Sequence, residues 1–361
     1  MKLNKSSEQK FYDIVSELKN QKYVSEDFAY STNQSESAWY VNGIIGFCAW
    51  FSALFILAFI FGTFHRILYD SPAVIMPLGI LLCGTAVIIT KHPKNKNNIF
   101  LNQLSLAICI AGEILFIIGT QEKFHSVSIN ALITIALQIF LIILYNNYIH
   151  RFLSVPAIFV ALLIIFKEIN AAYLTHPLVF ASAFAILKAW SYKQNIFCSK
   201  FSDLFAPISY GLSFAFLLTF LIVINKETSL YLEIENWYLS SAAILISLLY
   251  FENSAIKKLT LIRKNKFYIL VYLFTILLTI ATLKSPGIMA AFLIMLISFN
   301  YRNIFMLSFS VIFLFIYIIF FYYDLEINLL MKSQILISTG ILFLIIKYLI
   351  QKLQFNSEKT V

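Results

Sequence analysis

A single acidic residue interrupts the third long apolar run of the chain, and its type and position make it the first candidate for chemistry. Glu113 lies inside the run 99–120, which is long enough to cross the ~30 Å hydrocarbon core of a bilayer as a helix. An ionised carboxylate at the centre of such a span costs roughly 2.5–3.5 kcal/mol, so intramembrane acids face the protein interior and often belong to ion or substrate pathways.

The residues that a helix places beside Glu113 are also polar. Helical spacing puts Asn102, Cys109 and Thr120 on the same face, and Gln138 in the next apolar run is the expected neighbour across a helix interface. Two interpretations stay open for a candidate intramembrane polar site of Glu113, Asn102 and Gln138. In one, Glu113 carries a proton or binds a cation in a translocation path. In the other, a protonated Glu113 hydrogen-bonds to Gln138 or to a backbone carbonyl and fixes the packing of the helices.

A second group of charges stands between the last two apolar runs. Asp324 and Glu326 precede Lys332 in what we expect to be an outside loop, and they predict an ion pair that locks this helical hairpin. The alternative is a lysine that extends its ammonium group to the membrane surface. Exposed ion pairs contribute only about 0–1 kcal/mol, which favours that alternative.

Motifs typical of enzymes and of cofactor sites are absent from the sequence. No GxSxG, HExxH, Walker or GxGxxG pattern occurs in a credible context. The cysteines and histidines show no metal-ligand spacing, so we expect neither an enzyme nor a bound metal or cofactor. The histidines that we place in loops are His65, His92, His125 and His150.

The elements that must position these residues are membrane-spanning helices. Hydrophobic residues make up 60% of the 361 residues and charged residues 12%, against about 25% charged residues in soluble domains. Sheets with open edges leave backbone groups unpaired in lipid, and the runs do not alternate as barrel strands do. The predicted fold class is therefore all-α, a polytopic transmembrane helical bundle of about twelve spans. The predicted spans are 40–62, 73–90, 99–120, 129–145, 152–166, 171–189, 204–224, 239–251, 267–283, 286–299, 304–323 and 333–349.

The orientation follows from the distribution of basic residues. With twelve spans and the N-terminus inside, 21 of the 27 Lys and Arg residues fall in inside segments and 6 in outside loops. Cytoplasmic loops of membrane proteins carry this excess, so both termini are predicted to be cytoplasmic. The net charge of +9 then reflects topology, and we expect no nucleic-acid partner, because no basic patch with interleaved aromatic residues occurs.

The chain divides into a cytoplasmic N-terminal segment (1–38), a transmembrane domain (39–350) and a cytoplasmic tail (351–361). Ser6 and Gln9 resemble a helix capping box, and apolar residues at helical spacing follow. We expect a short amphipathic helix, which either lies on the membrane surface or docks a membrane-protein partner.

A six-plus-six repeat is also suggested by the sequence. Residues 94–96 and 264–266 both read Lys-Asn-Lys and precede the third and the ninth predicted span. Two parallel halves of this kind occur in several transporter folds. Basic inside loops recur for topological reasons alone, which is the simpler explanation.

Several short stretches resemble a family of bacterial multi-pass membrane proteins known as domain of unknown function 4401, and their order from the first span to the last carries the resemblance. It implies a bacterial inner-membrane protein without an assigned activity, and it supplies no catalytic residues. The resemblance also implies that glutamine often replaces Glu113, which favours the packing interpretation. The matching stretches are Trp39-Tyr40, Gly46, Ala49-Trp50, His150-Arg151-Phe152-Leu153-Ser154, Ser285-Pro286-Gly287-Ile288, Tyr322-Tyr323-Asp324-Leu325, Leu329-Leu330-Met331-Lys332-Ser333 and Gly340.

Two functions from different classes remain. A transporter or permease for a small solute is favoured by the number of spans and by the buried acid. A non-enzymatic scaffold or assembly partner in the envelope is favoured by the short loops and the absence of motifs. An intramembrane enzyme acting on lipid has the least support, because a single buried acid has no visible catalytic partner.

Overall fold

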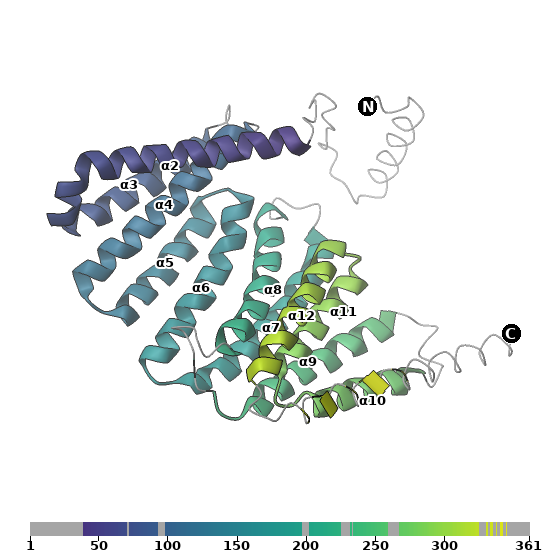
Figure 1. The fold of residues 1–361 in the computed structure, drawn as a ribbon. Coiled ribbons are helices and arrows are strands. Elements are labelled where there is room, and N and C mark those ends of the chain that lie inside the picture. Colours follow the sequence, from purple (N-terminus) through teal and green to yellow (C-terminus); the bar gives the residue numbers. More distant parts are fainter. Residues whose placement is uncertain are drawn as a thin grey trace, which may run out of the picture.

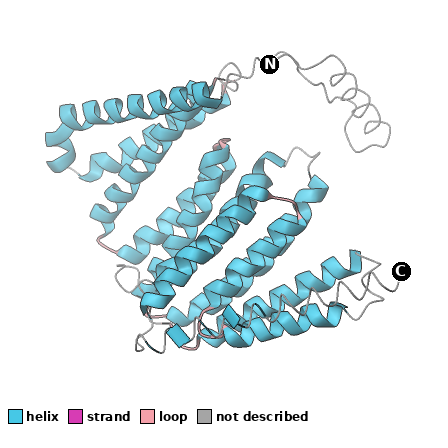
Figure 2. Cartoon of the chain, turned by 45° about the vertical axis from the view of Figure 1, so that its right-hand side comes forward, coloured by secondary structure: helices cyan, strands magenta, loops and turns pink. Residues whose placement is uncertain are grey.

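The computed structural model describes residues 39–70, 72–92, 98–196, 202–224, 232, 234–258 and 267–324, together with seven isolated positions between 330 and 344. Within these residues the chain forms eleven α-helices, one short 3-10 helix and no strand, so the prediction of an all-α fold is confirmed (Figure 2). The helices are α2 (Trp39–Asp70), α3 (Pro72–Lys91), α4 (Ile99–Phe124), α5 (Val127–Leu144), α6 (Tyr148–Glu168), η2 (Ala172–Leu174), α7 (Thr175–Ile196), α8 (Ser202–Ile224), α9 (Trp237–Lys258), α10 (Phe267–Ala281), α11 (Pro286–Asn300) and α12 (Ile304–Asp324).

Eight of the described helices are long and apolar enough to cross a membrane: α3 to α9 and α12. Three further apolar segments are shorter, at Gly43–Phe55, Val271–Ala281 and Pro286–Asn300. The first eleven predicted spans each correspond to one described helix, with ends that differ by up to eight residues. The total of twelve spans, the orientation and the repeat stay predictions. Most of the last predicted span, both terminal segments (1–38 and 351–361) and the predicted amphipathic helix lie outside the described residues.

Large apolar side chains cover much of the described helix surface. Phe47 in α2 is 69% exposed and Phe305 in α12 is 71% exposed, and many other leucine, isoleucine and phenylalanine side chains of these helices also point outward. Soluble monomers rarely expose contiguous apolar patches of this extent. This surface is therefore suited to contact with lipid.

The first three described helices form one group at an end of the molecule, and α5 and α6 lie between this group and helices α7 to α12 (Figure 1). Within the group, α3 and α4 approach at their backbones. A Cβ atom added to Gly79 would lie 2.6 Å from the carbonyl oxygen of Gly112, and one added to Gly119 would lie 2.7 Å from the backbone nitrogen of Met76. Small residues permit such close packing of membrane helices, and it fixes the face of α4 that turns away from α3.

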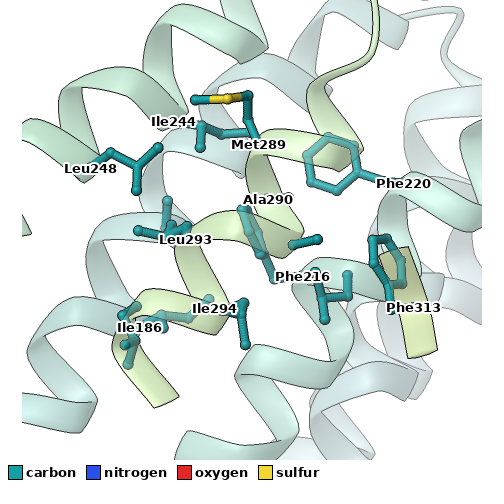
Figure 3. Close-up of a cluster of buried hydrophobic side chains, with 14 of the residues drawn as sticks. Ile186, Phe216, Phe220, Ile244, Leu248, Met289, Ala290, Leu293, Ile294 and Phe313 are labelled. Atoms are coloured by element: carbon teal, nitrogen blue, oxygen red, sulfur yellow. The ribbon is translucent and has the colours of Figure 1, made fainter. Parts of the chain in front are cut away.

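The largest core lies among α7, α8, α9, α11 and α12 (Figure 3). Ile244 and Leu293 are fully buried there, and Phe216 and Phe220 of α8 stack edge to face. The members of this core are mainly aliphatic and aromatic side chains, and Trp190 among them donates a hydrogen bond to the buried Ser213.

Candidate intramembrane site between α4, α5 and α6

Glu113 occupies the middle of α4 and is held there by a well-defined helix. The Asn98 side chain caps the first turn by accepting a hydrogen bond from the Leu101 amide at 3.2 Å, and His125 ends the helix in the left-handed region at a φ of 50°. Glu113 is only 9% exposed. Because α3 packs closely against α4 at Gly112, the Glu113 side chain turns toward α5 and α6.

Both carboxylate oxygens of Glu113 have partners on the neighbouring helices. Oε1 lies 2.5 Å from Nε2 of His150 on α6, and Oε2 accepts a hydrogen bond of 2.8 Å from Nε2 of Gln138 on α5. The Cys109 thiol, one turn before Glu113 on α4, donates to Oε1 at 3.5 Å. The carboxyl group therefore joins three helices inside the membrane domain.

His150 is the partner of Glu113 that sequence reasoning missed, and its predicted place in a loop is wrong. The Asn147 side chain accepts hydrogen bonds from the amides of Ile149 and His150, so α6 begins at Tyr148, before the start of the predicted span 152–166. His150 thus lies in the first helical turn and is 2% exposed. His65 also lies in a helix, α2. Asn147 stands directly before an apolar run, and asparagine in that place is an N-cap signal. This signal predicts a helix that begins before His150 and includes it.

The imidazole ring of His150 is fixed from its other side. Ser154 donates its hydroxyl proton to the His150 carbonyl at 3.0 Å, and its oxygen lies 3.3 Å from Nδ1 of the ring. When Nδ1–H donates to this oxygen, Nε2 keeps its lone pair, which then faces Glu113. The Tyr145 ring packs edge to face against the His150 ring, with 4.9 Å between the two ring centroids.

The Gln138 amide is only partly paired: its nitrogen donates to Glu113. The residue is 3% exposed, and its Oε1 atom is buried without a hydrogen-bond partner among the described residues. Leaving a buried acceptor unpaired costs about 1–3 kcal/mol. The Glu113 site therefore contains an unsatisfied hydrogen-bond acceptor as well as its paired groups.

The structure brings together a Cys/Glu/His cluster that sequence spacing did not show. One ligand atom each from Cys109, Glu113 and His150 lies within 4.8 Å of the others, and all three residues are buried. Cys109 and Glu113 come from successive turns of α4, whereas His150 comes from α6, 37 positions after Glu113. This distance along the chain hid the cluster from a search for local motifs.

Asn102 shares the polar face of α4 but lies away from the Glu113 site. Eleven residues of helix separate the two, about 16 Å along the axis. The Asn102 carbonyl accepts from the Asn147 side chain at 3.4 Å, and Ser105 pairs with the Tyr145 hydroxyl at 2.9 Å. This part of α4 therefore contacts the turn between α5 and α6.

The remaining polar residues lie further along the same interface or outside the described part of the chain. Thr120 bonds to the Asn130 side chain of α5 at 2.5 Å. Asp324 is the last residue of α12, but its side chain, Glu326 and Lys332 lie outside what the structure describes. The ion pair of this hairpin stays a prediction.

The helical fold, the apolar surface and the apolar helices long enough to span a bilayer define an integral membrane protein of the multi-pass helical class. A comparison with family models then identifies the family: a model described as "Domain of unknown function (DUF4401)" matches residues 38–353. The chain belongs to this family, as its sequence resemblance predicts. Neither the curated proteins nor the solved structures contain a match.

Proposed function

We propose that the protein is a permease for small cations in the bacterial inner membrane, and that Glu113 is the intramembrane group that binds the cation. The observation that carries this proposal is the burial of Glu113 beside other groups that can bind a cation. A carboxylate, an imidazole nitrogen and a thiol lie within 4.8 Å of one another there, and the buried Gln138 amide donates to the same carboxylate. Intramembrane acids that face the interior of a helical bundle commonly mark ion pathways.

The place of the site within the fold supports the same function. It lies at the seam where the group α2–α4 meets α5 and α6, and hydrogen bonds from Asn102, Ser105, Glu113 and Thr120 cross that seam. Transporters bind their ions where two packed bodies meet, because a small rotation of one body then changes access to the site.

On one side the site lies close to an exposed turn. The turn that precedes α6 includes the exposed Asn146, and His150 follows it within one helical turn. Glu113, in contrast, lies 14 residues after the start of α4, about 21 Å along its axis. The pair of His150 and Glu113 therefore connects the neighbourhood of an exposed turn with the middle of α4, and the distribution of basic residues predicts a cytoplasmic location for this turn.

The packing interpretation explains these contacts less completely. A glutamate that only fixes helices needs one or two hydrogen bonds, and Gln138 with a backbone carbonyl would supply them. The structure adds a second ionisable side chain and an unsatisfied oxygen, which a purely structural contact would avoid. No contact of the described residues favours the scaffold function, whose docking segment, 1–38, lies outside them. We propose no catalytic activity.

Cation flux in proteoliposomes tests this function. Vesicles that contain the purified full chain receive Na⁺, K⁺, Mg²⁺, Ca²⁺, Mn²⁺ or Zn²⁺ outside, and entry is followed with ion-selective dyes. At least one cation should enter faster than in protein-free vesicles, and Glu113→Gln should slow this entry at least tenfold. Glu122→Gln is the matched control, because Glu122 is exposed on the same helix. Equal flux in Glu113→Gln and the unmodified protein would contradict the proposal, as would the absence of any protein-dependent flux.

A further inference from the structure

The geometry points to a binding site for a divalent transition-metal ion of the zinc type, with Cys109, Glu113 and His150 as ligands and Gln138 as a fourth donor. The inference rests on the proposed function, because it uses the same site and names the class of cation that binds there. Its own support comes from the identity, the spacing and the charge of these side chains.

The identity of the donors selects the class of metal. Zn²⁺ is bound by cysteine sulfur, histidine nitrogen and carboxylate oxygen, often with three protein ligands and one further position. Mg²⁺ and Ca²⁺ take oxygen ligands and disfavour sulfur and imidazole. The cluster combines one thiol, one imidazole and one carboxylate within 4.8 Å, which is the mixture that borderline-soft divalent ions prefer.

The spacing of the donors is close to what such an ion needs. Ligand atoms around tetrahedral Zn²⁺ lie about 3.4–3.6 Å apart, given bond lengths of about 2.0–2.3 Å. The Cys109 sulfur and Oε1 of Glu113 are 3.5 Å apart, so these two atoms already fit. Nε2 of His150 and Oε1 of Glu113 are 2.5 Å apart and must separate by about 1 Å, which a small rotation of the Glu113 carboxyl group supplies.

The second coordination sphere is also in place. The Ser154 oxygen lies 3.3 Å from Nδ1 of His150, where it can accept from Nδ1–H and leave the Nε2 lone pair toward the cluster. Ligating histidines in metal sites are oriented by such an outer hydrogen bond. Gln138 is buried with its oxygen unpaired, and rotation of its amide presents that oxygen to the site. A bound ion therefore gives the orphaned Gln138 oxygen a partner.

Charge balance favours a divalent ion over a monovalent one. Without metal, the cluster is neutral when Cys109 keeps its thiol proton and the pair of Glu113 and His150 shares one further proton. Metal binding requires a thiolate and a carboxylate, so it displaces those protons. One doubly charged ion beside one thiolate and one carboxylate again gives a neutral cluster, and a neutral cluster has the lowest cost of burial in a membrane protein.

Cobalt substitution tests the site on the full chain in detergent under reducing conditions. Protein stripped with a chelator is titrated with Co²⁺, whose thiolate-to-metal charge-transfer band reports a sulfur ligand, and Zn²⁺ is then added in competition. We expect one Co²⁺ per chain, a charge-transfer band, and displacement by Zn²⁺. Cys109→Ser should abolish the band, and Glu113→Gln and His150→Asn should each weaken binding at least tenfold.

Matched controls separate the site from adventitious binding. The exposed residues Cys48 and Glu122 provide Cys48→Ser and Glu122→Gln, which should keep the band and leave binding unchanged. No stoichiometric binding by the unmodified protein, or a band that survives in Cys109→Ser, would overturn the inference. If Cys109→Ser fails to fold, the cobalt spectrum of the unmodified protein and His150→Asn still decide the question.

The binding and flux experiments fail in different ways. Cobalt bound at the cluster without flux of any cation would leave the metal site standing and remove the permease. Flux of Na⁺, K⁺, Mg²⁺ or Ca²⁺ that depends on Glu113, without Co²⁺ or Zn²⁺ binding, would keep the permease and remove the metal site.

Discussion

Nε2 of His150 lies 2.5 Å from Oε1 of Glu113, although the two residues belong to α6 and α4 and are separated by 37 positions. Each is buried, so neither can exchange its partner for bulk water without a movement of the helices. The contact links the N-terminal helix group to the rest of the described protein.

This contact should appear as energetic coupling. Glu113→Gln and His150→Asn should each lower the free energy of unfolding by about 1–3 kcal/mol, because each leaves a buried polar partner unpaired. The double variant should be less destabilised than the sum of the two by about 1 kcal/mol or more. Chemical unfolding in detergent micelles measures the cycle. Glu122→Gln combined with His150→Asn is the control pair, and its two changes in the free energy of unfolding should add to within about 0.5 kcal/mol. An equal coupling energy in both pairs would contradict a direct contact between Glu113 and His150.

The start of α6 should control the site from a distance. Asn147→Ala removes the side chain that caps the amides of Ile149 and His150, and loss of such a cap costs about 0.5–2 kcal/mol. We expect Co²⁺ to bind more weakly, because His150 loses its fixed position. Asn147→Asp restores a capping oxygen and should recover most of the affinity. Unchanged binding in Asn147→Ala would show that the cap does not position His150.

The close approach of α3 and α4 predicts opposite effects for two glycines of α3. Gly79→Ala places a methyl group about 2.6 Å from backbone atoms of α4, and such overpacking costs about 1–3 kcal/mol. Gly84 has no neighbouring atom within 4 Å of an added Cβ, so Gly84→Ala should stabilise the helix by up to about 1 kcal/mol. Thermal unfolding of the two variants compares them, and equal melting temperatures would contradict the packing described here.

The orientation can be tested by labelling single cysteines in a chain that lacks its native ones. Lys123→Cys lies at the predicted outer face, and Lys257→Cys at the predicted inner face. A membrane-impermeant maleimide should label Lys123→Cys in intact cells with a permeable outer envelope, and should label Lys257→Cys only after lysis. The reverse pattern would place the termini outside.

The sequence was sufficient for the parts of the fold that depend on local composition. Long apolar runs predict helices because lipid leaves the backbone no other partner, and the described helices follow those runs. Glu113 stands out in the sequence because it is an acidic residue within an apolar run. Helical spacing predicts that its polar face points toward the next helix, where Gln138 lies. These features need no knowledge of which helices pack together.

His150 could not be assigned in the same way. Its contact depends on how α6 packs beside α4, and that packing depends on close approaches such as Gly79 against Gly112 and on the start of α6 at Asn147. Hydropathy places the beginning of that span too late, since Tyr148, His150 and Arg151 are polar. Arg151 is buried nevertheless, because its guanidinium donates to the Ile142 carbonyl and to the Asn146 side chain.

The position of a bound metal ion tests the central claim most directly. Crystals of the full chain grown with Zn²⁺, with diffraction data collected on both sides of the zinc absorption edge, locate the ion without reference to activity. The account predicts one anomalous peak per chain among Sγ of Cys109, the Glu113 carboxylate and Nε2 of His150. An anomalous peak only at other histidines, or no peak at this cluster at saturating zinc, would contradict the proposed metal site.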